Sequence, residues 1–531
     1  MFSARSGPVC LFHMIHRLTC RKKDRHAFRC VPQYKPDNTE KADLKMMTKI
    51  FVILILFITY AAAQFDSGKY SRLYADYRLA PDDLMLMSPD FVANAIKNLG
   101  VRHPVLKIDE AGISVEERPI YHITFGSGKT KLLLWSQMHG DEPTATAALL
   151  AIFNFLGENT EDPFVSMVQD RLEIDALIML NPDGAFRFQR RNAQDLDINR
   201  DARLLQSPEG RTLKRMKDLV APDYAFNLHD MGGRETVGKS RKLLNIALMA
   251  PPFNENEEDS PSRIRAKKLI VILLKTLDPF IRGHMARYKA DYMPRAFGDA
   301  MQNWGVSTIL IESGMHDEAD PHFLVKINFV ALLGAFDVIA RDRVDEADAA
   351  AYEQIPLEGP DLFDILIRDA LIMNGSNIPS FRGDIGINID HRLSGDSVVT
   401  SCRIADLGDL SITTGRAIIE GKNLVVTPGL IGSAGQGGEA DHLFRAGYLV
   451  TSPEGPSFQT AEPEWIIPAE ELPLYTSVPA EKMNMKKSGL IKRGMNAELL
   501  IFSDSDPAQL ESENLIKLIH NGKIIELNPA K

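Results

Sequence analysis

The segment Lys131–Leu150 constrains the fold most, because it combines a strand pattern, a polar turn and a helix pattern in immediate succession. The apolar run Leu132–Trp135 is typical of a buried strand, and small and apolar residues resume after the turn with helical character. His139 and Glu142 lie in the turn. Open α/β sheets bind ligands at the carboxyl ends of their strands. This pair could therefore hold a metal ion, although by itself the pattern also fits a surface turn.

Residues 1–63 have the character of targeting sequence rather than of a folded domain. Residues 46–63 combine a short basic start, an apolar core and Ala61–Ala63, which predicts a secretory signal peptide. The core is shorter than the roughly 20 apolar residues of a membrane span. We therefore expect no stable span after cleavage, and an N-terminal anchor is the alternative. Residues 1–45 are basic and poorly patterned, and we interpret them as an upstream extension outside the natural product.

The rest of the chain is acidic and nearly free of cysteine. Residues 64–531 carry 50 Lys and Arg against 67 Asp and Glu, a formal charge of −17, which argues against nucleic acid and anionic membranes as partners. Cys402 is the one cysteine in this part of the sequence, so it cannot form an intrachain disulfide there. An exported protein of this kind fits the bacterial periplasm or the extracellular space.

Two domains are predicted on either side of a linker. Residues 64–345 alternate apolar strands with helical stretches, which is the pattern of an α/β domain. The charged and Pro-containing residues 346–360 are typical of a linker. Residues 361–531 contain short β-rich segments separated by Gly and Asp, which favours an all-β sandwich. Within the first domain we expect strands at 120–125, 131–137, 174–180, 224–228 and 308–311, and helices ending near 155, around 213, and at 261–277 and 323–339.

Further polar groups follow the later strands of the first domain. Asn181-Pro-Asp-Gly184 follows one strand, and Arg190 and Asn199-Arg200 come soon after it. An Arg in a cleft can bind a carboxylate with two parallel hydrogen bonds, and Asn adds a donor. His229 and Glu312 each end a strand. Taken singly, each residue also fits a solvated loop charge or a structural polar group.

Together, and in this order, these pieces resemble the zinc metallocarboxypeptidase family built on the carboxypeptidase A fold. The likeness covers roughly residues 118–339 and implies an α/β domain with a mixed sheet. It also implies one zinc ion per chain, held by His139, Glu142 and His229, in the catalytic His₂Glu set. Glu312 would act as the general base toward a metal-activated water. Arg190 rather than Arg191 fits the family's spacing and would stabilise the oxyanion.

The same resemblance implies an exopeptidase that acts on peptides with a free C-terminal carboxylate. Asn199 and Arg200 would hold that carboxylate. The family's mobile Tyr corresponds to Tyr292 or Tyr288, and we favour Tyr292. The pocket for the terminal side chain should lie near Gly298 and Asp299, and an Asp in it would favour basic residues.

Two other functions remain open from the sequence. The aspartoacylase and succinylglutamate desuccinylase group has related metal ligands and cleaves N-acyl amino acids, but Asn181–Gly184 and the length of the domain favour the peptidase. A catalytically silent peptide-binding protein is the second alternative, although all the expected catalytic positions are filled.

The C-terminal segments resemble the small β-domain of amidohydrolases of the D-aminoacylase and dihydroorotase kind. In that family a His-x-His follows the Pro-Gly that corresponds to Pro428-Gly429, whereas this chain continues Leu430-Ile-Gly-Ser. Fewer than 50 residues separate Gly429 from Pro479, and a catalytic barrel needs at least about 200. We therefore expect a β-domain without the barrel and without catalysis of its own.

Overall fold

The computed structural model describes residues 65–289, 291–373, 379–395 and 397–428, and short stretches between 430 and 526. The chain divides into two compact units, Met1–Phe65 and Asp66–Lys531. The predicted upstream extension 1–45 and signal peptide 46–63 lie outside the described residues. Apart from Phe65, the described residues all belong to the second unit.

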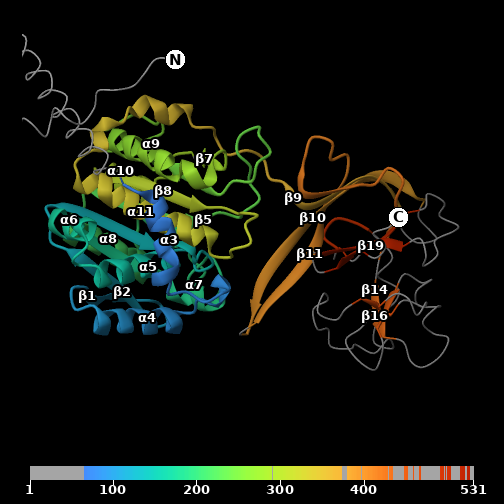
Figure 1. The fold of residues 1–531 in the computed structure, drawn as a ribbon, viewed down its shortest axis with the longest axis horizontal. Coiled ribbons are helices and arrows are strands. Elements are labelled where there is room, and N and C mark those ends of the chain that lie inside the picture. The colour runs from blue at the N-terminus through green and yellow to red at the C-terminus, as the bar shows by residue number, and fades with distance from the viewer. Residues whose placement is uncertain are drawn as a thin grey trace, which may run out of the picture. The chain divides into compact units, whose positions relative to one another are not determined.

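A mixed eight-stranded sheet forms the centre of the α/β domain (Figure 1). Its middle strands β4, β3, β5 and β8 are parallel, and antiparallel neighbours lie on both sides of them. This confirms the predicted mixed-sheet fold class. In spatial order the strands are β1 (Lys107–Ile113), β2 (Pro119–Gly126), β4 (Leu172–Ile178), β3 (Thr130–Ser136), β5 (Tyr224–Asp230), β8 (Ser307–Ser313), β6 (Ile246–Met249) and β7 (Met285–Arg287).

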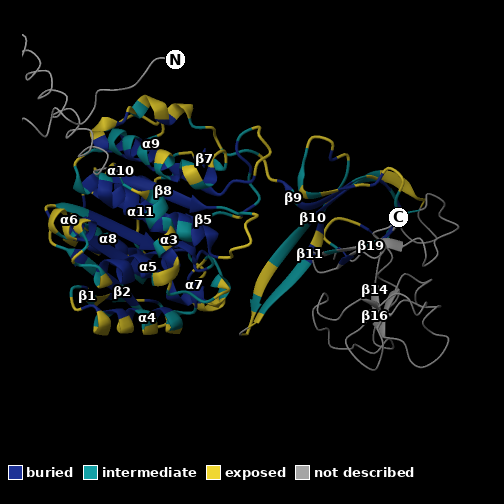
Figure 2. Ribbon diagram, in the orientation of Figure 1, coloured by how far each residue is buried: buried dark blue, intermediate teal, exposed yellow. Residues whose placement is uncertain are grey.

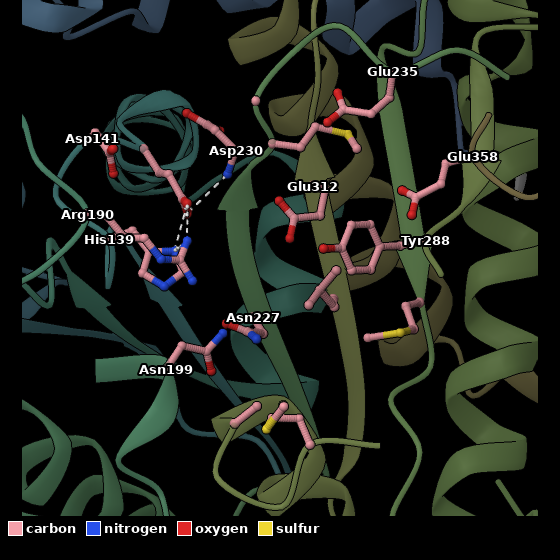
Figure 3. Close-up of a pocket in the computed structure, with 18 of the residues that line it drawn as sticks. His139, Asp141, Arg190, Asn199, Asn227, Asp230, Glu235, Tyr288, Glu312 and Glu358 are labelled. Carbon is pink, nitrogen blue, oxygen red and sulfur yellow. Dashed lines mark hydrogen bonds and ion pairs between the residues drawn. The ribbon is translucent and has the colours of Figure 1, made fainter. Parts of the chain in front are cut away.

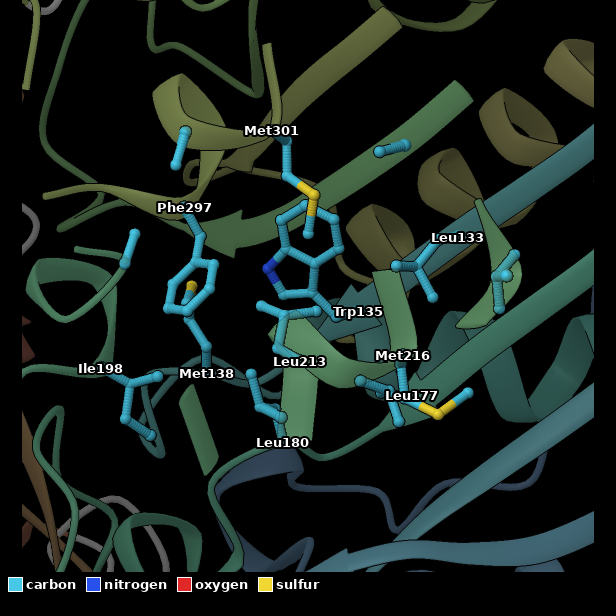
Figure 4. Close-up of a cluster of buried hydrophobic side chains, with 14 of the residues drawn as sticks. Leu133, Trp135, Met138, Leu177, Leu180, Ile198, Leu213, Met216, Phe297 and Met301 are labelled. Atoms are coloured by element: carbon cyan, nitrogen blue, oxygen red, sulfur yellow. The ribbon is translucent and has the colours of Figure 1, made fainter. Parts of the chain in front are cut away.

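Helices cover both faces of this sheet, which explains why its central strands are buried along almost their whole length. One face packs against α8 and α10 through a buried cluster that includes Leu133, Trp135 and Phe297 (Figure 4). The other face is covered by a layer in which α11 contacts α3, α5, α6 and α9. The helices are α3 (Ser67–Tyr77), α4 (Pro89–Arg102), α5 (Thr144–Glu158), α6 (Pro163–Arg171), α7 (Pro182–Arg187), α8 (Pro208–Val220), α9 (Pro261–Ile281), α10 (Phe297–Asn303) and α11 (Phe323–Ala340).

Two of these helices are apolar almost all round because protein surrounds them. Every residue of α5 from Thr144 to Leu156 is buried. Within the described part of the chain, α11 alone has the length and composition of a membrane span, and 89% of it is buried inside the domain. A helix buried on every side is either a core helix or a membrane span, and its burial by protein makes α11 a core helix.

The strands and helices that the sequence predicts for this domain are all present, with small shifts at their ends. The other helices and strands of this domain were not among the predicted ones, namely α3, α4, α6, α7, α10, β1, β6 and β7. Residues 346–360, predicted as a linker, pack on the α/β domain. Tyr352 in the 3₁₀ turn Ala349–Gln354 is buried, and its hydroxyl accepts a hydrogen bond of 3.1 Å from the Ala250 N–H.

The described residues of the C-terminal part, from 361 onward, contain β-strands and no helix, which agrees with the predicted β-rich character of this region. Its larger sheet has the order β11 (Ser397–Gly408), β10 (Phe381–Ser394), β9 (Phe363–Ile372), β13 (Val425–Pro428), β18 (Leu499–Phe502), β19 (Leu515–His520) and β20 (Lys523–Glu526), with β12 (Gly415–Glu420) also paired to β9. Its core is a cluster of buried, mainly aliphatic side chains that includes Ile367, Ile387 and Cys402. A second sheet contains β14 (Leu430–Ser433), β15 (Tyr448–Thr451), β16 (Phe458–Gln459) and β17 (Ile466–Ile467).

Candidate active site

Three neighbouring parallel strands deliver the predicted site residues to one edge of the sheet. Strand β3 ends just before His139, strand β5 carries His229 near its end, and strand β8 carries Glu312. His229 and Glu312 are direct partners in the register of β5 and β8. Because parallel strands end at the same edge, residues far apart in sequence meet there.

The first three predicted ligands form one compact buried group. The Nδ1 atom of His139 lies 2.7 Å from one carboxylate oxygen of Glu142, and the Nδ1 atom of His229 lies 2.7 Å from the other. The two imidazole rings are 4.8 Å apart between their centres (Figure 3 shows His139). The ligand atoms of all three residues lie within 4.8 Å of one another.

This donor set fits a zinc ion. Zinc takes imidazole nitrogen and carboxylate oxygen at about 2.0–2.2 Å, and catalytic sites use three such protein ligands. Both imidazoles turn the same ring nitrogen toward Glu142, so two nitrogens and a carboxylate converge on one point. The second ring nitrogen of His139 lies 3.3 Å from Asp197, the kind of outer contact that fixes the orientation of a metal ligand.

The pKa values of the carboxyl groups in and around this site are displaced in opposite directions. Burial favours a neutral Glu142, but the imidazoles of His229 and His139 outweigh it and lower the pKa of Glu142 to about 2. Burial, followed by the negative charges of Glu142 and Asp230, raises the pKa of Glu312 well above its usual value. Burial and Glu142 raise the pKa of Asp230 to about 7. A bound cation would favour the ionised forms of all three carboxylates.

Arg190 reaches into the same cavity, whereas Arg191 is not among the residues that line it. The Nη1 atom of Arg190 lies 3.1 Å from Nδ1 of His139, and its Nε donates to Asp197 over 3.1 Å. Asp197 thus contacts both Arg190 and His139, and these partners hold its pKa well below the usual range although burial opposes the shift. Asp197 lies two residues before Asn199 in the Asp-x-Asn-Arg motif, and its contacts with His139 and Arg190 become visible only in the folded chain.

Asn199 and Arg200 lie on the opposite side of the metal group from Glu142. The side-chain nitrogen of Asn199 lies 3.4 Å from Nε2 of His229, and its oxygen accepts a hydrogen bond from the Phe297 N–H. Arg200 donates to the carbonyl of Asn199 over 2.7 Å. Both side chains line the cavity, which has a volume of about 680 Å³.

Of the two candidate tyrosines, Tyr288 lines the cavity and Tyr292 is not among the lining residues. Figure 3 shows the Tyr288 ring beside Glu312. Burial and the nearby charges of Glu312, Glu358 and Glu235 raise the pKa of Tyr288 to about 12, so its hydroxyl stays protonated. Tyr288 is therefore the better placed of the two.

Gly298 and Asp299 line the cavity, where the sequence places the side-chain pocket. Asp299 lies in the first turn of α10 and accepts a hydrogen bond of 2.9 Å from the Met293 N–H. Burial raises the pKa of Asp299 to about 6. It is therefore an anion at neutral pH.

Further polar residues line the cavity beyond the predicted site residues, among them Asn227, Asp230, Glu235, Glu358 and Asp361. Asn227 is fully buried in β5, and within the described structure neither polar atom of its side chain has a hydrogen-bond partner. Its polarity in an otherwise apolar strand was the signal that could have identified it. Glu358 and Asp361 follow the predicted end of the catalytic domain, and nothing in their local sequence marks them.

Comparison with known proteins gives a consistent family. Residues 92–227 match the family model described as zinc carboxypeptidase. The chain is similar to a probable carboxypeptidase 2 of Trichophyton verrucosum, with 28% identity over 150 residues, which cover 28% of this chain and 27% of that protein. It is also similar to carboxypeptidase SOL1 of Arabidopsis thaliana, with 37% identity over 65 residues, or 12% of this chain and 13% of the relative.

Among solved structures, a metallo-carboxypeptidase from Burkholderia cenocepacia is similar at 19% identity and a TM-score of 0.39, covering 48% of this chain and 69% of that one. The chain spans only about a quarter of the length of the carboxypeptidase 2 relatives that it matches.

Proposed function

We propose that this chain is a zinc-dependent carboxypeptidase that hydrolyses the C-terminal bond of peptides, because residues 92–227 match the zinc carboxypeptidase family. The observation that carries the proposal is the meeting of His139, Glu142, His229 and Glu312 at the ends of adjacent strands. A guanidinium group and a carboxylate-binding Asn–Arg pair line the same cavity.

His139, Glu142 and His229 would hold one zinc ion per chain. Zinc in such a site lowers the pKa of water and polarises a carbonyl group. Glu312 lies beside the group in a buried setting that raises its affinity for a proton. It is therefore suited to accept a proton from water and to return it to the nitrogen of the leaving amine.

Arg190 and the pair Asn199–Arg200 would bind different parts of the substrate. Arg190 lies against His139, where its charge can stabilise an oxygen that becomes negative as the carbonyl is attacked. Asn199 and Arg200 offer donors that match the terminal carboxylate of a peptide. Tyr288 offers a protonated hydroxyl from the other side of Glu312. Asp299 favours a terminal side chain that carries a positive charge.

The experiment is a peptide assay on purified, zinc-loaded protein. Matched peptides with free and amidated C-termini, ending in Lys, Leu or Glu, are compared with N-acyl amino acids. We expect release of the last amino acid from the free-acid peptides only. Equal cleavage of amidated peptides, or cleavage of N-acyl amino acids alone, would contradict the proposal. Metal analysis should find about one zinc per chain.

We also propose that the protein is exported, because residues 46–63 have the pattern of a signal peptide. N-terminal sequencing of the protein from its native host tests this. We expect the mature chain to begin near residue 64, and a chain that retains residues 46–63 would contradict export by cleavage.

A further inference from the structure

The β-region is joined to the active site by a hydrogen-bonded segment rather than by a free linker. Residues 356–362 run beside the loop 231–243, which follows the His229 strand. The Gly359 N–H donates to the carbonyl of Thr236 over 2.6 Å, and the Leu362 N–H donates to the carbonyl of Arg234 over 2.9 Å. Next to the first of these bonds, Val237 and Glu358 form an antiparallel bridge.

A buried ion pair fastens this loop to the first strand of the β-region. The Nε atom of Arg234 donates to Asp364 in β9 over 2.9 Å, and the Asp364 side chain is only 3% exposed. Arg234 also donates to the carbonyl of Ile389 in β10, while the Ile389 N–H donates to Asp364 over 2.7 Å. The guanidinium and the carboxylate are thus both held by the β-region.

A second tie reaches the loop that follows the Glu312 strand. Arg416 in β12 pairs with Asp317 over 2.7 Å, and its other nitrogen lies 3.4 Å from Asp364. The loop after β5, the strand that carries His229, is therefore fastened to β9, and the loop after β8, the strand that carries Glu312, is fastened to β12.

The fastened segments form one wall of the cavity, which we call the β-side wall: Gly232, Glu235, Glu358, Gly359 and Asp361. Figure 3 shows Glu235 and Glu358 on the far side of Glu312 from Asn199. In the proposed function Asn199 and Arg200 bind the terminal carboxylate. The β-side wall then faces the part of the peptide that precedes the cleaved bond.

We propose that the all-β region contributes to the active site. Through the ion pair of Asp364 and Arg234 it holds the β-side wall in position, and this wall binds the substrate residues N-terminal to the cleaved bond. The proposal rests on the proposed carboxypeptidase function. Removing one partner of a buried pair leaves the other charge unpaired, so the loop 231–243 should become mobile. A mobile wall weakens the binding of long peptides and leaves the shortest substrates almost unaffected.

The test uses the full chain with the variants Asp364→Asn and Arg234→Gln and the double variant. Arg382→Gln is the matched control, because Arg382 pairs with Asp369 on the surface of the β-region over 3.5 Å. Two substrates share their last two residues: an N-acylated dipeptide and an N-acylated pentapeptide. The ratio of their kcat/KM values measures the contribution of the β-side wall.

In each single variant we expect this ratio to fall about tenfold through the KM of the pentapeptide, with the dipeptide changed less than about twofold. The double variant should be no worse than either single variant, because both changes break one pair. The control should match the wild type. An equal fall for both substrates, no fall, or additive effects would overturn the inference.

Amide hydrogen exchange separates this inference from the function on which it rests. We expect residues 231–243 to exchange faster in Asp364→Asn than in the wild type, and unchanged exchange overturns the proposed tie even in an inactive protein. If zinc-loaded wild type hydrolyses no peptide, the proposed function fails. If the wild type hydrolyses peptides but the variants keep the preference for the pentapeptide, the proposed function stands and only the proposed role of the β-side wall fails.

Discussion

The two regions of the molecule bury their strands differently. In the α/β domain, strands β5 and β8 are buried along almost their whole length, because helices cover both faces of the sheet. In the all-β region, the long strands β10 and β11 are buried mainly near their middles and are otherwise exposed or half-buried (Figure 2). A polar side chain therefore has a different meaning in each region.

In the α/β domain, the buried carboxyl groups of Glu142, Asp230 and Glu312 lie at strand ends around the cavity, and their pKa values are displaced. Among the described residues of the all-β region, the buried carboxylate is that of Asp364, which instead accepts hydrogen bonds from a guanidinium and a backbone N–H. Burial alone does not distinguish the carboxylates of Glu312 and Asp364. They differ in that Glu312 faces an open cavity, whereas Asp364 is surrounded by hydrogen-bonding partners.

The largest expected effect is that of metal removal. Dialysis against a chelator should abolish peptide hydrolysis, because no side chain can replace the Lewis acid that His139, Glu142 and His229 would bind. Adding zinc back should restore the activity. Hydrogen exchange in β9–β11 should not change on chelation. Full activity in metal-free protein would show that the buried polar residues of the α/β domain do not act through a metal ion.

The next effect is that of Glu312→Gln. This change keeps the shape of the side chain but removes the proton acceptor, so kcat should fall by about 10²–10⁴-fold with zinc content unchanged. Glu420→Gln, at an exposed position at the end of β12, is the control and should behave as the wild type. Steady-state kinetics with metal analysis checks both. A variant with normal kcat would assign the proton transfer elsewhere.

Side-chain truncations test the difference in burial directly. Leu134→Ala removes a fully buried side chain of β3 and should cost about 2–5 kcal/mol of unfolding free energy. Ile418→Ala in β12, where the side chain is 46% exposed, should cost about 1 kcal/mol or less. Denaturant unfolding followed by fluorescence and circular dichroism measures both. Equal costs would show that the all-β region is as tightly packed as the α/β domain.

The smallest effect is a pH-dependent selectivity. Burial gives Asp299 a pKa of about 6, so this carboxyl is largely neutral at pH 5 and an anion at pH 7 and above. The preference for peptides ending in Lys over those ending in Gln should therefore rise several-fold across this range, as an ion pair becomes possible. Asp299→Asn should flatten the rise. The ratio of kcat/KM values from pH 5 to 8 is the measurement.

Much of the α/β domain and of its site follows from local sequence. Strand and helix periodicities predict the central elements, since burial on both faces demands apolar runs. The structure brings together the polar residues that end these runs or follow them, namely His139, Glu142, His229 and Glu312. Parallel strands end at one edge, so polar strand ends converge without further information.

Other features depended on tertiary contacts. The choice of Tyr288 over Tyr292 rests on which side chain faces the cavity, and the spacing of the two residues along the chain does not determine this. Glu358 reaches the cavity from the predicted linker and Asp361 from the start of the predicted β-domain. Arg234 pairs with Asp364, which lies 130 residues further along the chain. Local periodicity reports how each element is buried. Which distant segments pack against it is decided only when the whole chain has folded.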